Sequence, residues 1–296
     1  MILNFIHGFC MAAADSVPGV SGGTIAFILG FYDRFVSAID AVFADEMAAR
    51  RRAVIYLMKI AAGWVVGMAV CAAVLSGLFE KNIYFMCSMF MGLTAASIPF
   101  IAAEEKKSLS DVRFIPFMLA GATAVIGITA LRGHISGFAV ADFSDLKPLS
   151  LIYIFMAGTF AITAMILPGI SGSSILLITG IYLPTIQAVH SLLKLQLNVL
   201  PGLAMLGLGI IAGMGLSIHW LSKALMKYRS QLMWLIMGLM TGSLYAVANG
   251  PACLDVPMSP VNISSFSLPA FVLGIAVLAA LELSRRFDSE NAELSY

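Results

Sequence analysis

Long stretches without any Asp, Glu, Lys or Arg constrain this chain most. Six of them cover residues 60–79, 82–103, 114–131, 195–222, 230–254 and 256–281. Each is long enough for a transmembrane helix, which needs roughly 20 apolar residues. The whole chain is 60% hydrophobic and 11% charged, whereas soluble domains carry about 25% charged residues. Because the bilayer cannot pair backbone polar groups, these stretches predict an all-α integral membrane protein.

A Pro-Gly-Ser motif occurs twice within such apolar sequence. Residues 18–23 read PGVSGG and residues 168–173 read PGISGS, 150 positions later. The match continues in register, because Gly30 and Tyr32 correspond to Gly180 and Tyr182. A break of this kind inside a membrane segment persists only where it is buried in protein or lines a wet cavity. Two breaks in corresponding halves indicate the binding site of a transporter.

The basic residues predict the topology. Of the 17 Lys and Arg residues, 12 fall in four clusters, so the four clusters are assigned to the cytoplasm by the positive-inside rule. They are Arg50, Arg51, Arg52 and Lys59; Lys106, Lys107 and Arg113; Lys223, Lys227 and Arg229; and Arg285 and Arg286. Following the chain through them places the N-terminus and the C-terminus in the cytoplasm. The uncharged stretch 148–193 begins and ends outside, so it folds back as a hairpin or crosses twice.

We therefore expect two inverted-topology repeats, each a re-entrant helical hairpin plus three transmembrane helices. The first repeat, 1–147, has its hairpin at 1–43, entering from the cytoplasm, and spans at 60–79, 82–103 and 114–131. The second repeat, 148–296, has its hairpin at 148–193, entering from outside, and spans at 200–222, 231–250 and 268–284. Three spans separate the hairpins, and an odd number inverts the second half.

Weaker similarities also relate the two halves. Gly63 and Gly67 correspond to Gly209 and Gly213 at an offset of 146, and Gly121 corresponds to Gly274 at an offset of 153. Small residues spaced in this way also favour close helix packing, which is the simpler interpretation of these pairs.

The motif has the residue types of an anion site. Its prolines end a preceding helix, its glycines let the backbone approach a ligand, and its serines are good N-caps. Free amides at such a helix N-terminus suit a phosphate. The alternative is a tight turn whose amides are paired internally. The expected phosphate-binding residues are Ser21, Gly22, Gly23, Thr24, Ser171, Gly172, Ser173 and Ser174, and the expected structural residues are Pro18, Gly19, Pro168 and Gly169.

Asp15 is an isolated carboxylate just before the first break, since residues 1–14 and 16–32 carry no charge. Intramembrane carboxylates are expensive and usually functional, which favours coupling to H⁺ or Na⁺. The alternative is an Asp that binds amides and steadies the loop. Its counterpart at the offset of 150 is Met165. Arg34 attracts a phosphate in one interpretation, and in the other it pairs with Asp33 at the interface.

The remaining polar residues suggest no enzyme chemistry. His7 is more often a satisfied structural residue than a proton relay, and the three tryptophans lie near span ends, where they act as interfacial anchors. Four scattered cysteines without a CxxC pair imply neither a metal nor a disulfide framework. No Walker A sequence follows either motif, so nucleotide hydrolysis is not indicated. No cofactor is expected, and a net charge of +1 gives no indication of nucleic acid.

Residues 14–24, ADSVPGVSGGT, and 164–173, AMILPGISGS, resemble the two signature segments of the PopT family of bacterial polytopic membrane proteins. The resemblance spans essentially the whole chain. It implies location in the bacterial cytoplasmic membrane and translocation of undecaprenyl phosphate, the polyprenyl carrier lipid of peptidoglycan and other envelope polymers. The lipid would return from the outer to the cytoplasmic leaflet by alternating access, possible coupling ions being H⁺ and Na⁺.

Three other functions stay open at this point. A secondary transporter of a small soluble anion would use the same hairpins, but its route would be closed to lipid. A membrane enzyme acting on a lipid phosphate would need a convergent constellation of His, Asp or Arg, which the sequence does not indicate. A purely structural protein would have no need for irregular backbone inside the membrane.

Overall fold

The computed structural model describes residues 2–15, 21–132, 143–144, 147–172, 175–176, 179–253 and 258–293. These residues are mostly helical and contain no strand, which confirms the all-α class. The α-helices are α1 (Ile2–Asp15), α2 (Gly22–Ile28), α3 (Tyr32–Val42), α4 (Met47–Glu104), α5 (Ile115–Arg132), α6 (Pro148–Ile166), α8 (Tyr182–Leu193), α9 (Leu200–Lys227), α10 (Arg229–Ala248) and α11 (Leu268–Glu293). Short 3₁₀ turns lie at Val112–Phe114, Leu197–Val199 and Gly250–Cys253.

Six segments within the described residues are long and apolar enough to cross a membrane. They are Met47–Cys71, Asn82–Glu104, Val112–Leu131, Pro148–Ile166, Leu197–Lys227 and Arg229–Ala248. The apolar helices Ile2–Asp15 and Leu268–Ala280 are shorter. The protein is thus a multi-pass membrane protein by length and composition of its helices.

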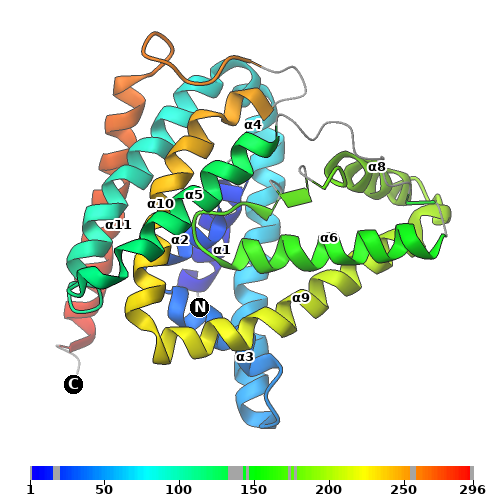
Figure 1. Ribbon diagram of the computed structural model, residues 1–296, viewed down its shortest axis with the longest axis horizontal. Coiled ribbons are helices and arrows are strands. Elements are labelled where there is room, and N and C mark those ends of the chain that lie inside the picture. Colours follow the sequence, from blue (N-terminus) through cyan, green and yellow to red (C-terminus); the bar gives the residue numbers. More distant parts are fainter. Residues whose placement is uncertain are drawn as a thin grey trace.

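Helix α4 consists of two parts that meet at Asn82, whose φ of −133° is not helical. Figure 1 shows the chain rising along the first part and descending along the second. The first part begins at Met47, so the basic residues Arg50, Arg51 and Arg52 lie on a helix and not in a loop before it.

The first part of α4 packs closely on α1. A side-chain carbon added at Gly8 would overlap the carbonyl oxygen of Ile60, and one added at Gly63 would overlap that of Phe5. Glycine is therefore required where these two backbones approach, as in other membrane helix pairs.

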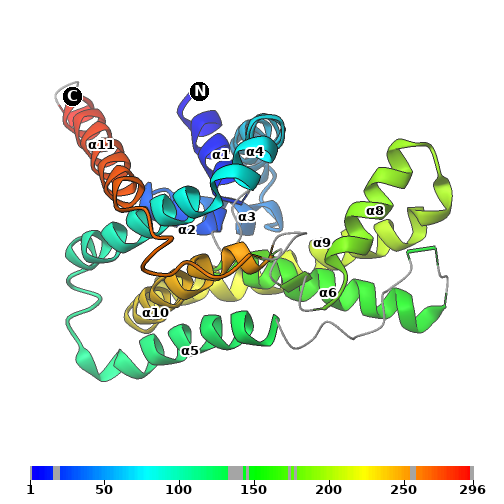
Figure 2. The ribbon, with the colours of Figure 1, turned by 90° about the horizontal axis from the view of Figure 1, so that it is seen from above.

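The same contacts recur between α6 and α9, which lie side by side in Figures 1 and 2. A carbon added at Gly158 would lie 2.7 Å from the carbonyl oxygen of Leu206, and one added at Gly209 would overlap that of Phe155. Gly158 and Phe155 follow their counterparts on α1 by 150 positions, and Leu206 and Gly209 follow theirs on α4 by 146. The sequence offsets therefore match residues in equivalent packing positions.

The remaining helices pair across the two halves of the chain. The second part of α4 packs on α11, where a carbon added at Gly92 would overlap the carbonyl oxygen of Phe271. Helix α10 packs on α5, where a carbon added at Gly238 would overlap that of Met118. These contacts also correspond, at offsets of 146 and 153. Each half thus contributes one helix to a pair with the other half.

The largest hydrophobic core lies between α1, α2, α3, α4, α9, α10 and α11, and includes the fully buried Val36, Ile218, Ile236 and Met240. A smaller core joins α6, α8 and α9 at one end of the molecule, with α11 at the other end (Figure 2). The two motif segments adjoin the larger core, since Ile25 and Ile166 both belong to it.

Candidate functional site

The first motif begins where α1 ends, and it leads into the short helix α2. Ser21 is the N-cap of α2, and its Oγ accepts a hydrogen bond from the Gly23 amide at 3.2 Å. The Ser21 carbonyl accepts from the amides of Thr24 at 2.9 Å and Ile25 at 3.4 Å. The N-cap role expected for Ser21 is confirmed, whereas Pro18 and Gly19 lie outside the described residues.

Asp15 provides the acceptor for the remaining amide of this turn, that of Gly22. Its Oδ1 accepts from the Gly22 amide at 2.6 Å, and its Oδ2 accepts from Trp64 Nε1 at 2.8 Å. The four amides from Gly22 to Ile25 therefore all have acceptors inside the protein. The expectation of free amides at this N-terminus was wrong, because the partial positive charge of the helix end attracts the preceding carboxylate. Trp64, expected to be an interfacial anchor, is also a hydrogen-bond partner of Asp15.

The second motif has the same arrangement with different chemistry. A carbon added at Gly172 would lie 3.1 Å from Met165 Sδ, just as one added at Gly22 would lie 2.7 Å from Asp15 Oδ2. Met165 thus covers Gly172 as Asp15 covers Gly22. Ser171 is buried, and Ser173 and Ser174 lie outside the described residues.

Gly169 is fixed by its backbone and by its neighbour Leu239. Its φ of +92° is a conformation that residues with a side chain rarely adopt, and an added carbon would lie 2.6 Å from the Leu239 carbonyl carbon. Pro168 lies between Ile166, the last residue of α6, and Gly169, so it stands where the helix has ended.

The two motifs contact each other. Thr24 Oγ1 accepts a hydrogen bond from the Gly169 amide at 2.8 Å, and the Tyr32 hydroxyl donates to the Ile166 carbonyl at 3.0 Å. Both bonds are buried. Polar groups exposed by the end of α6 are therefore satisfied by side chains from the other half of the chain.

The segments that follow the motifs end alike. Gly30 and Gly180 both have positive φ, at 72° and 69°. The Phe31 amide donates to the Ala26 carbonyl at 3.1 Å, and the Ile181 amide donates to the Leu176 carbonyl at 2.9 Å. These are the bonds of a helix C-terminus closed by glycine, so Gly30 and Gly180 make equivalent turns in the two halves.

Arg34 does not pair with Asp33, contrary to one interpretation of the sequence. The Asp33 carboxylate instead accepts from Arg229 Nη1 at 2.8 Å, which links α3 to the start of α10. Arg34 is exposed, and its Cζ lies 4.7 Å from the centroid of the Tyr56 ring. Such a contact is a cation–π interaction and leaves the guanidinium edge open to another partner.

Arg229 is held by a second carboxylate, that of Glu105. Arg229 Nε donates to Glu105 Oε2 at 3.1 Å, Arg229 Nη2 donates to Oε1, and Ser108 Oγ donates to Oε2 at 2.7 Å. Partial burial alone would raise the pKa of Glu105, but these hydrogen bonds outweigh it and the pKa lies below its ordinary value. The bonds join the ends of α3, α4 and α10 on the side assigned to the cytoplasm.

Two residues that the sequence analysis did not select have unsatisfied polar atoms. His7 Nδ1 and the Tyr56 hydroxyl are buried and have no hydrogen-bond partner within the described residues. The expectation of a satisfied structural His7 was therefore wrong. The only sequence signal was the presence of His7 in an otherwise uncharged membrane segment, and no pattern linked it to Tyr56.

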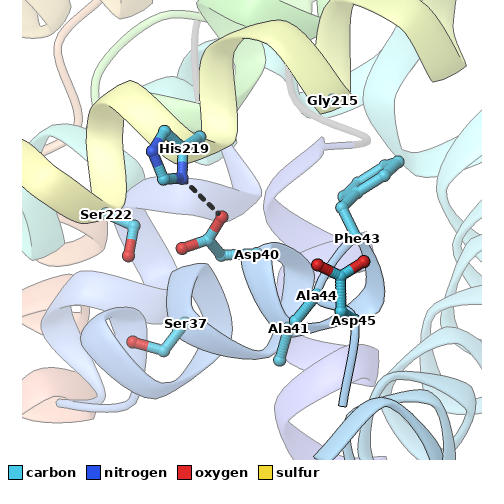
Figure 3. A pocket seen from close by; sticks show the side chains of 9 residues that line it. All are labelled: Ser37, Asp40, Ala41, Phe43, Ala44, Asp45, Gly215, His219 and Ser222. Carbon is cyan, nitrogen blue, oxygen red and sulfur yellow. Dashed lines mark ion pairs between the residues drawn. The ribbon is translucent and has the colours of Figure 1, made fainter. Parts of the chain in front are cut away.

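A pocket of about 660 Å³ opens between α3 and α9 (Figure 3). His219 on α9 and Asp40 on α3 face each other across it, with His219 Nδ1 3.5 Å from Asp40 Oδ1. Ser37 and Ser222 add hydroxyl groups to its wall. The sequence analysis did not single out either residue of this His–Asp pair, because the two are far apart in the chain.

The described residues contain no group of His, Cys, Asp or Glu that could hold a metal ion. Within the same residues, Cys10, Cys71 and Cys87 form no disulfide.

Comparison with known proteins adds to this geometry. Residues 11–263 match the model of the VCA0040-like family, described as undecaprenyl phosphate translocase-like. A polyprenyl-phosphate transporter of Vibrio cholerae is 35% identical over 255 residues, which cover 81% of this chain and 75% of that protein. A polyprenyl-phosphate transporter of Staphylococcus aureus is 30% identical over 293 residues, 98% of each chain. No solved structure matches significantly.

The matched region includes both motifs and the helices that position them, in agreement with the resemblance carried by the two signature segments. The chain therefore belongs to the undecaprenyl phosphate translocase-like family.

Proposed function

We propose that this protein carries undecaprenyl phosphate, or a closely related polyprenyl phosphate, from the outer to the cytoplasmic leaflet of the bacterial cytoplasmic membrane. The lipid would thereby be reused in the synthesis of peptidoglycan and other envelope polymers. The names of the relatives support this substrate. The observation that carries a transport role is the direct contact between two irregular backbone segments, one from each half, at Thr24 and Gly169.

The two halves are proposed to be inverted-topology repeats that rock against each other. This is supported by the helix pairs that recur at equivalent positions, α1 with α4 and α6 with α9. Alternating access around a fixed site is the usual mechanism of such transporters. Hydrogen bonds between the two halves, such as that from Tyr32 to Ile166, would have to break and reform in each cycle.

The motif residues Ser21, Gly22, Gly23 and Thr24, with Ser171 to Ser174, are proposed to form the polar route for the phosphate. In the conformation described, the Asp15 carboxylate accepts the hydrogen bond of the Gly22 amide. Two anions cannot share one donor, so a phosphate reaches this amide only when Asp15 moves away or is neutralised by a cation. Competition of this kind would couple transport to H⁺ or Na⁺ through Asp15.

The test is leaflet exchange of labelled undecaprenyl phosphate in liposomes that contain the purified protein, with and without a proton or sodium gradient. The key variant is Gly22→Trp, which places a bulky side chain where Asp15 lies. The matched control is Gly207→Trp, because nothing lies within 4 Å of a carbon added at Gly207. We expect exchange by the parent protein and the control but not by Gly22→Trp.

Absence of lipid exchange by folded parent protein under any gradient would contradict the lipid assignment. Uptake of a soluble phosphate by the same liposomes would then favour a transporter of small anions. Equal exchange by Gly22→Trp and Gly207→Trp would remove the motif from the route while leaving the lipid function intact.

A further inference from the structure

Three polar side chains, one each from α1, α3 and α4, converge around the end of the first motif segment: His7, Arg34 and Tyr56. The guanidinium of Arg34 lies over the ring of Tyr56, with Cζ 4.7 Å from the ring centroid. The imidazole of His7 stacks on Phe31 at 4.1 Å between centroids, and Phe31 lies directly before the helix that carries Arg34. Arg34 interacts electrostatically with both His7 and Tyr56.

This cluster has capacity for hydrogen bonds that the protein itself does not use. Tyr56 is only 7% exposed, yet its hydroxyl has no partner within the described residues, and neither does His7 Nδ1. Buried polar groups in folded proteins are almost always hydrogen-bonded, so two unpaired atoms that both interact electrostatically with one arginine need an explanation. A ligand that supplies acceptors to both would provide it.

The local charge favours an anion. Among the described residues Arg34 forms no ion pair. The adjacent carboxylate, Asp33, is engaged by Arg229. The carboxylate on α1, Asp15, is engaged by the Gly22 amide and Trp64. The positive charge of Arg34 therefore lacks a carboxylate partner in the part of the chain that the structure describes.

A phosphate monoester matches these donors. Arginine binds phosphate oxygens through a planar fork of N–H groups, and the phosphate has further oxygens that accept from a phenol and an imidazole. Aliphatic side chains that precede His7 and Tyr56 in the chain are exposed, Ile6 at 44% and Ile55 at 45%. A hydrocarbon chain attached to the phosphate can lie against such a surface, which favours a lipid phosphate over a free one.

The position of the cluster indicates which leaflet it serves. Tyr56 follows the basic residues Arg50 to Arg52 on the same helix by about one turn. These basic residues are assigned to the cytoplasmic surface by the positive-inside rule. The cluster therefore lies at the level of the headgroups of the cytoplasmic leaflet.

We infer that His7, Arg34 and Tyr56 form a binding site for the phosphate headgroup of the lipid substrate in the cytoplasmic leaflet. This site rests on the proposed function and deepens it, since it is the place where the transported lipid phosphate leaves the protein. His7 and Tyr56 are thereby binding residues in addition to Arg34.

The experiment measures binding of undecaprenyl phosphate, and separately of inorganic phosphate, to the full-length protein in nanodiscs. The variants are Tyr56→Phe, which removes only the hydroxyl, Arg34→Gln, and His7→Phe, which keeps the ring that stacks on Phe31. The control is Tyr84→Phe, which removes a hydroxyl already bonded to Ser259. We expect binding of the lipid to weaken about tenfold in Tyr56→Phe and more in Arg34→Gln, because hydrogen bonds to a charged group are strong.

If the Tyr56 hydroxyl had only a structural role, Tyr56→Phe would lower the melting temperature of the protein. Loss of an unpaired buried hydroxyl should leave the melting temperature of Tyr56→Phe unchanged or raised, so weakened binding at unchanged stability is the specific signature. Unchanged lipid binding in Tyr56→Phe and His7→Phe would overturn the site, even where the parent protein transports the lipid. Binding of inorganic phosphate that depends on these residues, with no binding of the lipid, would overturn the lipid assignment and identify a soluble phosphate as the ligand.

Discussion

The two halves of the protein place different chemistry on one backbone arrangement. In the first half, Asp15 covers Gly22 and accepts from Trp64. In the second half, Met165 covers Gly172, and the residue at the position of Trp64 is Ile210. The helix contacts, the glycine turns and the end of each motif segment match between the halves. The two halves therefore share a backbone arrangement and differ in charge at one equivalent position, Asp15 in the first half and Met165 in the second.

Replacing Asp15 by Met, the corresponding residue of the second half, should have the largest effect on transport of the substitutions considered. The Gly22 amide and Trp64 Nε1 would both lose a charged acceptor, each hydrogen bond of this kind being worth about 1.5–3 kcal/mol. We expect exchange of undecaprenyl phosphate in liposomes to fall by more than about tenfold. Met165→Leu serves as the control, since volume-conserving swaps of this kind usually cost less than about 1.5 kcal/mol. Equal losses in the two variants would mean that the charge at Asp15 has no special role.

Substitution of Gly22 and of Gly172 by Ala should lower the stability of the protein to different extents. A carbon at Gly22 would lie 2.7 Å from Oδ2 of Asp15, whose carboxylate is held by two hydrogen bonds, whereas one at Gly172 would lie 3.1 Å from the flexible end of Met165. Gly22→Ala should therefore lower the free energy of unfolding by about 1–3 kcal/mol, and Gly172→Ala by less.

Thermal unfolding in detergent measures this difference, with Gly207→Ala as the unhindered control. The comparison between the halves fails if Gly172→Ala proves as harmful as Gly22→Ala.

Offsets within the sequence were enough to predict much of the fold. The in-register match of residues 18–32 and 168–182 predicted equivalent turns, and Gly30 and Gly180 share a positive φ as that match requires. The glycine pairs expected to pack closely do so, as Gly63 against Phe5 and Gly209 against Phe155 show. A periodic or repeated pattern survives in the sequence because many residues contribute to it.

Contacts between single residues far apart in the chain could not be predicted in this way. A tryptophan near a span end predicts an interfacial anchor, and nothing in the sequence predicted that α1 brings Asp15 within reach of the Trp64 indole. The convergence of His7, Arg34 and Tyr56 depends on the packing of three helices. No pattern in one sequence reports such a convergence, because each residue looks ordinary in its own segment.

Trp64→Phe should produce an intermediate effect that belongs to the first half alone. Phenylalanine keeps much of the ring packing but leaves Asp15 Oδ2 without its donor, which should cost about 1–2 kcal/mol of stability. Trp220→Phe is the matched control, because Trp220 is 73% exposed. A melting temperature of Trp64→Phe no lower than that of Trp220→Phe would show that the bond to Asp15 contributes little.

The smallest expected effect on stability concerns the ion pairs of Arg229, which involve a residue of the first half, Asp33, without a charged counterpart in the second half. Asp33 joins α3 to Arg229, which Glu105 also holds, and the residue that corresponds to Asp33 in the second half is Leu183. The pKa of Glu105 is lower in the folded protein than its ordinary value of 4.5. The ionised pair therefore stabilises the fold above pH 4.5, and this contribution is lost as the pH falls through the lower folded pKa.

Glu105→Gln should lower stability by less than about 1 kcal/mol at pH 7, since Arg229 is partly exposed. The difference in melting temperature between the parent protein and this variant should shrink as the pH is lowered from 7 to below 4.5. A difference that stays constant over that range would mean that the charge of Glu105 does not hold the end of α4 to α10. The asymmetry between the halves would then reside in Asp15 and its partners alone.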